Sequence, residues 1–198
     1  MPELFDNLQT KSEIYREKIG TPLLRYTPFQ SHTITTFRLI LAASFPFLIL
    51  KFSTLAWAII IISISLDAVD GMVARYQNQA SDRGKFIDVL ADQLTFIFLG
   101  LGYILLIPTL NFQITCLIII IPLTYLITII RKNEKKPSDW LIKPQARLTG
   151  YKIVFLIIIN SWLFNWLSFE LTVWLLWFEI IICSLHFSFH YYKFVALK

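Results

Sequence analysis

Six apolar runs, each close to the length of a membrane-spanning helix, follow one another along this sequence. A helix needs about 20 mostly apolar residues, at a rise of about 1.5 Å each, to cross the hydrocarbon core of a bilayer. The six runs cover residues 33–50, 53–75, 84–107, 112–130, 150–167 and 171–192. This pattern predicts an all-α integral membrane protein with six transmembrane helices.

The composition agrees with this class. The chain is 56% hydrophobic and only 16% charged, whereas soluble domains carry about 25% charged residues. Its 17 Phe and 6 Trp exclude a disordered chain. Both cysteines, Cys116 and Cys183, lie inside apolar runs with no polar partner in sequence, so they indicate neither a disulfide framework nor a zinc site.

The first thirty residues differ from the rest because they are polar and lack the apolar core of a signal peptide. Leu4, Leu8, Ile14 and Ile19 are loosely spaced as on one side of a helix. We therefore predict a cytoplasmic or interfacial helix within residues 1–30, followed by a six-helix transmembrane domain over residues 31–198. A frayed tail is the alternative.

The positive charges predict the orientation. With six spans, every Lys and Arg of the 18 except Lys51 falls on one side of the membrane, and such an excess marks the cytoplasmic side. Both termini and the basic connections are therefore expected in the cytoplasm. Because topology accounts for the net charge of +5, the charge does not indicate a nucleic-acid partner.

Four carboxylates interrupt the second and third apolar runs: Asp67, Asp70, Asp88 and Asp92. A charge at membrane depth costs at least ~2.5–3.5 kcal/mol and faces a polar site rather than lipid. At ~100° per residue, the first two share a stripe of one helix and the last two share a stripe of the next. The short connection between the runs makes these helices antiparallel neighbours, so the two stripes can face each other near the cytoplasmic surface.

Carboxylates that converge in a low dielectric need cations to stay ionised. Oxygen ligands without neighbouring His or Cys suit Mg²⁺ or Mn²⁺, which commonly bridge carboxylates to phosphates, and two such ions could act together. Gly71, Ala74 and Gly84 leave room for a ligand, and Arg75 adds a cation for phosphate. A divalent-cation or proton transporter could use the same carboxylates, although the far halves of both runs are almost entirely apolar.

Residues 67–92 read DAVDGMVARYQNQASDRGKFIDVLAD. This segment resembles the motif of the CDP-alcohol phosphatidyltransferase family: D-x-x-D-G-x-x-A-R, eight residues, then G-x-x-x-D-x-x-x-D. Every fixed position is filled at the right spacing. The resemblance implies a membrane enzyme of phospholipid synthesis, which transfers a phosphatidyl or phospho-alcohol group from a CDP-linked donor to a hydroxyl and releases CMP.

The resemblance also implies roles for the motif residues. Asp67, Asp70 and Asp88 would hold the metal ions. Asp92 would be the general base for the acceptor hydroxyl and a further candidate ligand. Gly71, Ala74 and Gly84 would line the CDP pocket, with Arg75 on the diphosphate. The family implies a homodimer as well.

A weaker similarity lies in the first apolar run, where the family shows N-x-x-T-x-x-R before a proline. Thr35, Arg38 and Pro46 fit this pattern, and His32 replaces the Asn. The resemblance therefore adds Thr35 to the donor pocket. The role of His32, a cytidine contact or an interfacial histidine, stays open.

The residues around the last aspartates bear on the substrates. Family members that use CDP-choline or CDP-ethanolamine often carry His-Gly between the last two Asp, but this chain has Val89, Leu90 and Ala91. This favours CDP-diacylglycerol as donor over a CDP-alcohol with a diacylglycerol-type acceptor. The segment is similar to phosphatidylglycerophosphate synthases, except that Val89 replaces a Pro and Gln93 replaces a Lys. Glycerol 3-phosphate or another polar alcohol is therefore expected as acceptor.

Arg147 and Lys152, at the start of the fifth apolar run, are candidates for binding the acceptor, with orientation and attraction to anionic lipid as the alternative. Gly100 and Gly102 are expected to permit close helix packing. Three further polar residues have no role that the sequence assigns: Glu179, His186 and His190.

Overall fold

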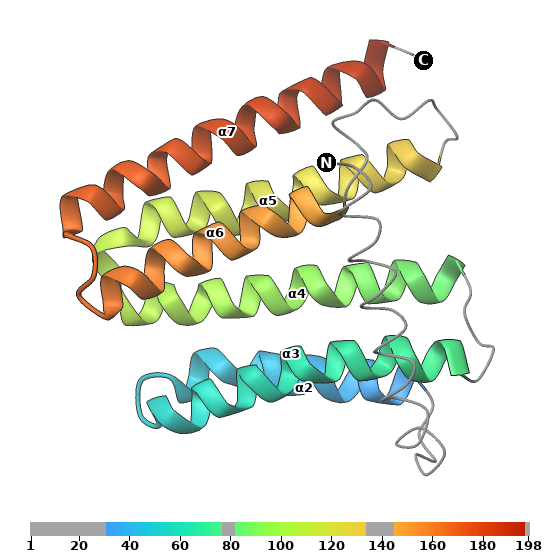
Figure 1. Cartoon of the computed structure of the whole chain (residues 1–198), viewed down its shortest axis with the longest axis horizontal. Helices are drawn as coiled ribbons and strands as arrows, with labels where there is room; N and C mark the ends of the chain where they lie inside the picture. The colour runs from blue at the N-terminus through green and yellow to red at the C-terminus, as the bar shows by residue number, and fades with distance from the viewer. Residues whose placement is uncertain (1–30, 77–81, 134–144, 197–198) are drawn as a thin grey trace, which may run out of the picture. The chain divides into compact units, whose positions relative to one another are not determined.

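The computed structural model describes residues 31–76, 82–133 and 145–196, and all regular elements within these ranges are helical (Figure 1). They are α2 (Ser31–Leu48), α3 (Ser53–Tyr76), α4 (Asp82–Leu106), the 3₁₀ helix η1 (Pro108–Leu110), α5 (Asn111–Asn133), α6 (Gln145–Leu163) and α7 (Phe169–Ala196). The all-α prediction is confirmed, and each predicted run corresponds to one helix. The interfacial helix predicted within residues 1–30 lies outside the described residues.

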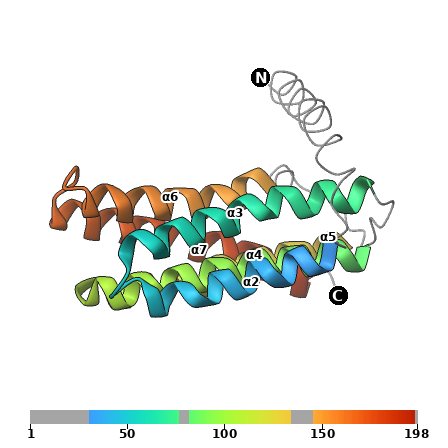
Figure 2. The same cartoon turned by 90° about the horizontal axis from the view of Figure 1, so that it is seen from below.

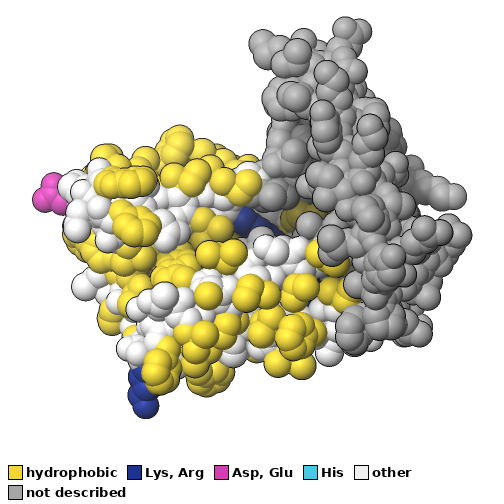
Figure 3. Space-filling model, turned by 60° about the horizontal axis from the view of Figure 1, so that its bottom comes forward, with side chains coloured by type: hydrophobic (Ala, Val, Ile, Leu, Met, Phe, Trp, Pro, Cys, Tyr) yellow, Lys and Arg dark blue, Asp and Glu magenta, His cyan; other side chains and the backbone are white. Residues whose placement is uncertain are grey.

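Within the described part of the chain, three helical segments are long and apolar enough to cross a membrane: Phe86–Leu106, Pro108–Ile130 and Phe169–Ala196. Shorter apolar stretches cover Thr33–Leu48, Ser53–Ser63 and Gly150–Leu163. Figure 3 shows hydrophobic side chains spread over much of the described surface in that view. Such a surface is typical of lipid contact, since large apolar patches are rare on soluble monomers.

The chain divides into two compact units, Met1–Leu99 and Gly100–Lys198, and the division falls within α4. In the first unit, α2 and α3 pack along each other and are joined by a tight turn in which the amide of Phe52 donates to the Leu48 carbonyl at 2.8 Å (Figure 2). Phe45 and Trp57 meet edge to face, with ring centroids 5.5 Å apart. Ile34 packs with Val73 and the neighbouring side chains of α3.

In the second unit, α5 packs on α7, and α6 contacts both helices. Tyr103, near the end of α4, is fully buried. Its ring lies edge to face with Phe155 at 5.9 Å, and its hydroxyl accepts a 2.8 Å hydrogen bond from Asn160. A buried tyrosine hydroxyl needs such a partner, because an unpaired polar group is costly in an apolar environment.

The turn from α6 to α7 corrects the predicted end of the fifth run. Asn165 adopts the left-handed conformation, with φ of 60°, and the amide of Trp166 donates to the Ser161 carbonyl at 2.8 Å. These contacts satisfy the last carbonyls of a helix and end it. Ser168 then caps α7, because its hydroxyl accepts from the amide of Leu171 at 3.3 Å. The helix therefore ends at Leu163, although the sequence remains apolar to residue 167.

Gly100 allows α4 to approach α5 closely, as the sequence predicted. A Cβ added at Gly100 would overlap the Cγ2 methyl of Ile118 on α5. Ile118 is buried, and a β-branched side chain in a helix has essentially one χ1 rotamer, so the methyl cannot easily move aside. The packing of these two helices therefore depends on the absence of a side chain at Gly100.

Replacing Gly100 with Ala is expected to destabilise the protein by about 1–3 kcal/mol, the usual cost of overpacking. Thermal unfolding in detergent measures this effect. Gly150→Ala is the matched control: an added Cβ there meets nothing within 4 Å, so it should be neutral or stabilising by up to ~1 kcal/mol. Adding Ile118→Ala should reduce the penalty of Gly100→Ala. Equal stabilities of Gly100→Ala and wild type would contradict the packing argument.

Candidate active site

Two consecutive helices carry the acidic motif. Asp67 and Asp70 belong to the last turns of α3, and Asp88 and Asp92 belong to the first half of α4. Of these four side chains, only those of Asp88 and Asp92 are described. The predictions for six motif residues concern side chains outside the described ones: Asp67, Asp70, Gly71, Ala74, Arg75 and Gly84.

Asp88 and Asp92 lie one helical turn apart, so they share a face of α4. Both are half-buried, and the side chain of Asp92 is 40% exposed. A carboxylate in this setting stays accessible to a substrate while its neighbours restrict its orientation. The i, i+4 arrangement therefore agrees with the face that the sequence predicted for this helix.

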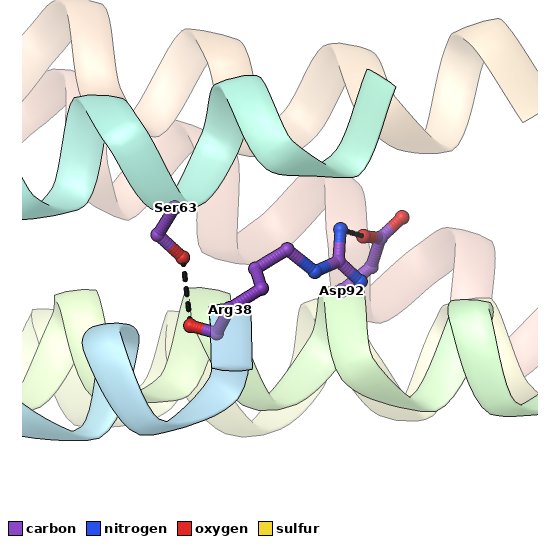
Figure 4. Close-up of polar contacts among 3 residues, drawn as sticks. All are labelled: Arg38, Ser63 and Asp92. Atoms are coloured by element: carbon purple, nitrogen blue, oxygen red, sulfur yellow. Dashed lines mark hydrogen bonds and ion pairs between the residues drawn. The ribbon is translucent and has the colours of Figure 1, made fainter. Parts of the chain in front are cut away.

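Arg38 of α2 provides the cation next to Asp92. Its Nη1 donates a charged hydrogen bond to Oδ1 of Asp92 at 3.1 Å (Figure 4). The two residues lie on different helices and are 54 positions apart in the sequence. Arg38 is only 1% exposed. A guanidinium stays ionised in proteins, and a buried charge without an opposite charge costs several kcal/mol. The pair with Asp92 thus offsets the cost of placing Arg38 inside the protein.

The backbone of Arg38 is held as well. Ser63 of α3 donates its hydroxyl to the Arg38 carbonyl at 3.0 Å, and both residues are buried (Figure 4). A helix carbonyl has a second lone pair that can accept such a bond in addition to its intrahelical one. Arg38 is therefore linked to α3 through its backbone and to α4 through its side chain.

Thr35 lies one turn before Arg38 on α2 and is buried. Residues three apart in a helix lie on the same side of it, so Thr35 is on the side of α2 that carries Arg38. Its predicted contact with the donor stays a prediction, and the side chain of His32 lies outside the described residues.

Gln93 follows Asp92 and replaces the Lys found in similar synthases. It is 2% exposed, and its amide nitrogen and oxygen have no hydrogen-bond partner among the described residues. Gln93 thus places no positive charge beside Asp92 in the sequence. In the structure, the cation beside Asp92 is Arg38, which reaches it from another helix.

The described donors fit part of a hard-cation site. Asp88 and Asp92 offer only oxygen ligands from one helix face, which is the chemistry that Mg²⁺ and Mn²⁺ select. Among the residues that the structure describes, no three His, Cys, Asp or Glu side chains gather into a metal site. A complete metal site would therefore need donors beyond Asp88 and Asp92, and the sequence supplies Asp67 and Asp70 for this purpose.

The second unit contains the remaining predicted residues. Lys152 lies with its ammonium 5.5 Å from the centre of the Tyr125 ring, and the side chain of Arg147 lies outside the described ones. His186 accepts or donates a 2.9 Å hydrogen bond with the Tyr151 hydroxyl, and its ring centroid lies 4.6 Å from that of the buried His190. Glu179 is also buried, at 3% exposure.

Arg38 is the site residue that sequence reasoning missed. It fitted a family pattern and the count of cytoplasmic charges, but no role was assigned to it. A signal was present, because an arginine within an apolar run is as costly as an aspartate and implies a buried partner. The sequence could not show which of the four aspartates is that partner.

Comparison with known proteins identifies the family. The family described as CDP-alcohol phosphatidyltransferase matches residues 30–185, which include the complete acidic motif. No curated protein matches the sequence significantly. The chain belongs to the CDP-alcohol phosphatidyltransferase family. It is thus a membrane enzyme that transfers a substituted phosphate group from a CDP-alcohol, in a family that generally uses divalent metal ions.

Proposed function

We propose that this enzyme transfers the phosphatidyl group of CDP-diacylglycerol to the hydroxyl of a small polar alcohol and releases CMP. The complete motif over residues 67–92, on α3 and α4 of a chain that belongs to this family, carries the proposal. Val89, Leu90 and Ala91 support this donor, because they replace the His-Gly typical of enzymes that use CDP-choline or CDP-ethanolamine.

Asp92 is the general base in this proposal. Its partly exposed carboxylate takes the proton of the acceptor hydroxyl, whose oxygen forms a bond to the phosphorus that carries the diacylglycerol. The bond from that phosphorus to the bridging oxygen breaks, and CMP leaves with the electron pair. A base must lie within hydrogen-bond reach of the proton it removes, and the partial exposure of Asp92 allows this approach.

The other motif residues bind the donor. Arg75 contacts the diphosphate, while Gly71, Ala74, Gly84 and Thr35 shape the CDP pocket. Two Mg²⁺ or Mn²⁺ ions would be held by Asp67, Asp70 and Asp88, with Asp92 as a further candidate ligand. When bound, these ions would supply positive charge near the phosphate oxygens. The site faces the cytoplasm, because the positive charges of the connections predict that orientation. The family expectation of a homodimer is part of the proposal.

A CMP-release assay tests the proposed function. Purified enzyme in detergent receives CDP-diacylglycerol, Mg²⁺ or Mn²⁺, and one acceptor from a panel that includes glycerol 3-phosphate and unphosphorylated alcohols. We expect acceptor-dependent CMP release from this donor. CMP release only from a CDP-alcohol in the presence of diacylglycerol would replace the proposal by a phosphotransferase activity, and no release with any pair would remove it.

Arg147 is expected to bind a phosphorylated acceptor. Arg147→Ala should raise the KM for such an acceptor by about 10–100-fold, since a hydrogen bond to a charged group contributes ~1.5–3 kcal/mol. The donor KM should change little. Lys193→Ala is the matched control, because it also removes a cation but has no role in the proposed site. Lys193 lies over the Phe189 ring on α7, at 4.5 Å from its centre. An unchanged acceptor KM in Arg147→Ala would rule out this role.

A further inference from the structure

Arg38 is more deeply buried than a cation needs to be if its only role is to set the orientation in the membrane. It lies on α2 with 1% of its surface exposed, and its Nη1 contacts Oδ1 of Asp92 at 3.1 Å. A cation that only reported the cytoplasmic side of the membrane would extend toward the headgroups, as long basic side chains do. The buried position indicates that the guanidinium acts inside the site.

Three helices meet at this residue. The hydroxyl of Ser63 holds the Arg38 carbonyl at 3.0 Å from α3, while the guanidinium reaches the carboxylate on α4 (Figure 4). The first contact fixes the rotation of α2 about its axis relative to α3. Because the Arg38 side chain leaves α2 at that level, the same contact aims the guanidinium at Asp92.

The carboxylate of an unrestrained aspartate rotates over a broad range about its Cβ–Cγ bond. A hydrogen bond to Oδ1 from a buried donor narrows this range, and it therefore fixes the direction of the second carboxylate oxygen as well. A base that already points at its substrate avoids the entropic cost of alignment in the reaction, and a misplacement of about 1 Å can reduce a rate ~100-fold.

We propose that Arg38 is a positioning residue that orients the Asp92 carboxylate toward the acceptor hydroxyl. Ser63 supports this role, because its hydrogen bond to the Arg38 carbonyl fixes the position of Arg38 relative to α3. This inference rests on the proposed function, in which Asp92 is the base. It assigns to α2 a role in the proton-transfer step, beyond the contact with the donor that the sequence predicted for Thr35.

The kinetic test compares Arg38→Ala, Arg38→Lys and wild type in CMP release with saturating acceptor. Arg38→Ala should lower kcat by about 100-fold or more while the donor KM changes less than about threefold, because the orientation of Asp92 affects the reaction rather than donor binding. Arg38→Lys should recover part of the loss, and added guanidinium should partly rescue Arg38→Ala. Direct binding of CDP to the purified protein supplies a readout besides turnover.

A double-mutant cycle with Asp92→Asn tests whether Arg38 acts through Asp92. If it does, Arg38→Ala added to Asp92→Asn should lower kcat no further. Ser63→Ala should show a smaller loss of the same kind. Ser65→Ala is its matched control, because the exposed Ser65 donates to the Ile61 carbonyl of its own helix, and it should leave kcat unchanged.

The proposal is overturned by a wild-type kcat in Arg38→Ala or by independent, multiplying losses in the cycle. Loss of CDP binding in parallel with kcat also overturns it, because Arg38 would then contact the donor. If Arg38→Ala does not fold, Arg38→Lys and Ser63→Ala decide, and a wild-type kcat in both contradicts the proposal. A wild-type enzyme that releases no CMP would instead refute the proposed function, which separates the two outcomes.

Discussion

Asp92→Asn is expected to reduce kcat by about 100- to 10,000-fold, the usual contribution of a positioned general base. An amide cannot accept the proton of the acceptor hydroxyl, yet it keeps the size of the side chain. Its oxygen can still accept a hydrogen bond from the Arg38 guanidinium, which lies 3.1 Å from the carboxylate in the wild type. The variant should therefore fold and bind CDP-diacylglycerol nearly as well as wild type.

Two comparisons make this result specific to the base. Asp92→Ala should be less stable than Asp92→Asn in thermal unfolding, since only the alanine removes the acceptor of the hydrogen bond from the buried Arg38. Single-turnover CMP release and binding of CDP separate chemistry from donor affinity. An equal loss of turnover and of donor binding in Asp92→Asn would place Asp92 among the metal ligands alone.

Removal of divalent ions with EDTA is expected to abolish CMP release, and Mg²⁺ or Mn²⁺ should restore it. The family generally uses divalent metal ions, and the described carboxylates Asp88 and Asp92 offer the oxygen donors that these ions prefer. Without a cation, the negatively charged phosphate that is transferred and the carboxylates of the site would repel each other. The concentration of metal that restores half of the activity measures the affinity.

Thermal unfolding gives a second measurement of the same site. A ligand that binds only the folded state stabilises it by ~2.7 kcal/mol at 100 times its Kd, so Mg²⁺ should raise the melting temperature of wild type. This shift should be reduced in Asp88→Asn. The Gly150→Ala variant, changed at an open position of α6, should keep the full shift. A melting temperature that no divalent ion raises, with activity that survives EDTA, would contradict a metal-dependent site.

Hydropathy predicted the helices well but not all of their ends. The second apolar run, expected at 53–75, agrees with α3 at Ser53–Tyr76 to within one residue. The fifth run was expected at 150–167, whereas α6 covers Gln145–Leu163. Hydropathy reports where a chain can enter lipid, while hydrogen bonds at the ends determine where a helix stops, as the left-handed Asn165 does after α6.

The contacts between helices were less predictable. Motif spacing placed Asp88 and Asp92 on one face of α4, because periodicity within a helix is local information. The pairing of Arg38 with Asp92 depends on how α2 and α4 are rotated and shifted relative to each other, which no short sequence pattern contains. The close approach at Gly100 was predicted as a type of contact, but its partner, Ile118, appears only in the structure.

The ion pair between α2 and α4 also imposes an order on biosynthesis. Arg38 is made 54 residues before Asp92, which is about 3–11 s earlier at ~5–20 residues per second. During this interval the first apolar helix carries Arg38 before its partner Asp92 has been made. The Arg38–Asp92 contact can therefore form only after the helix that carries Asp92 has been made, so this part of the active site is assembled after synthesis of the third apolar helix has begun.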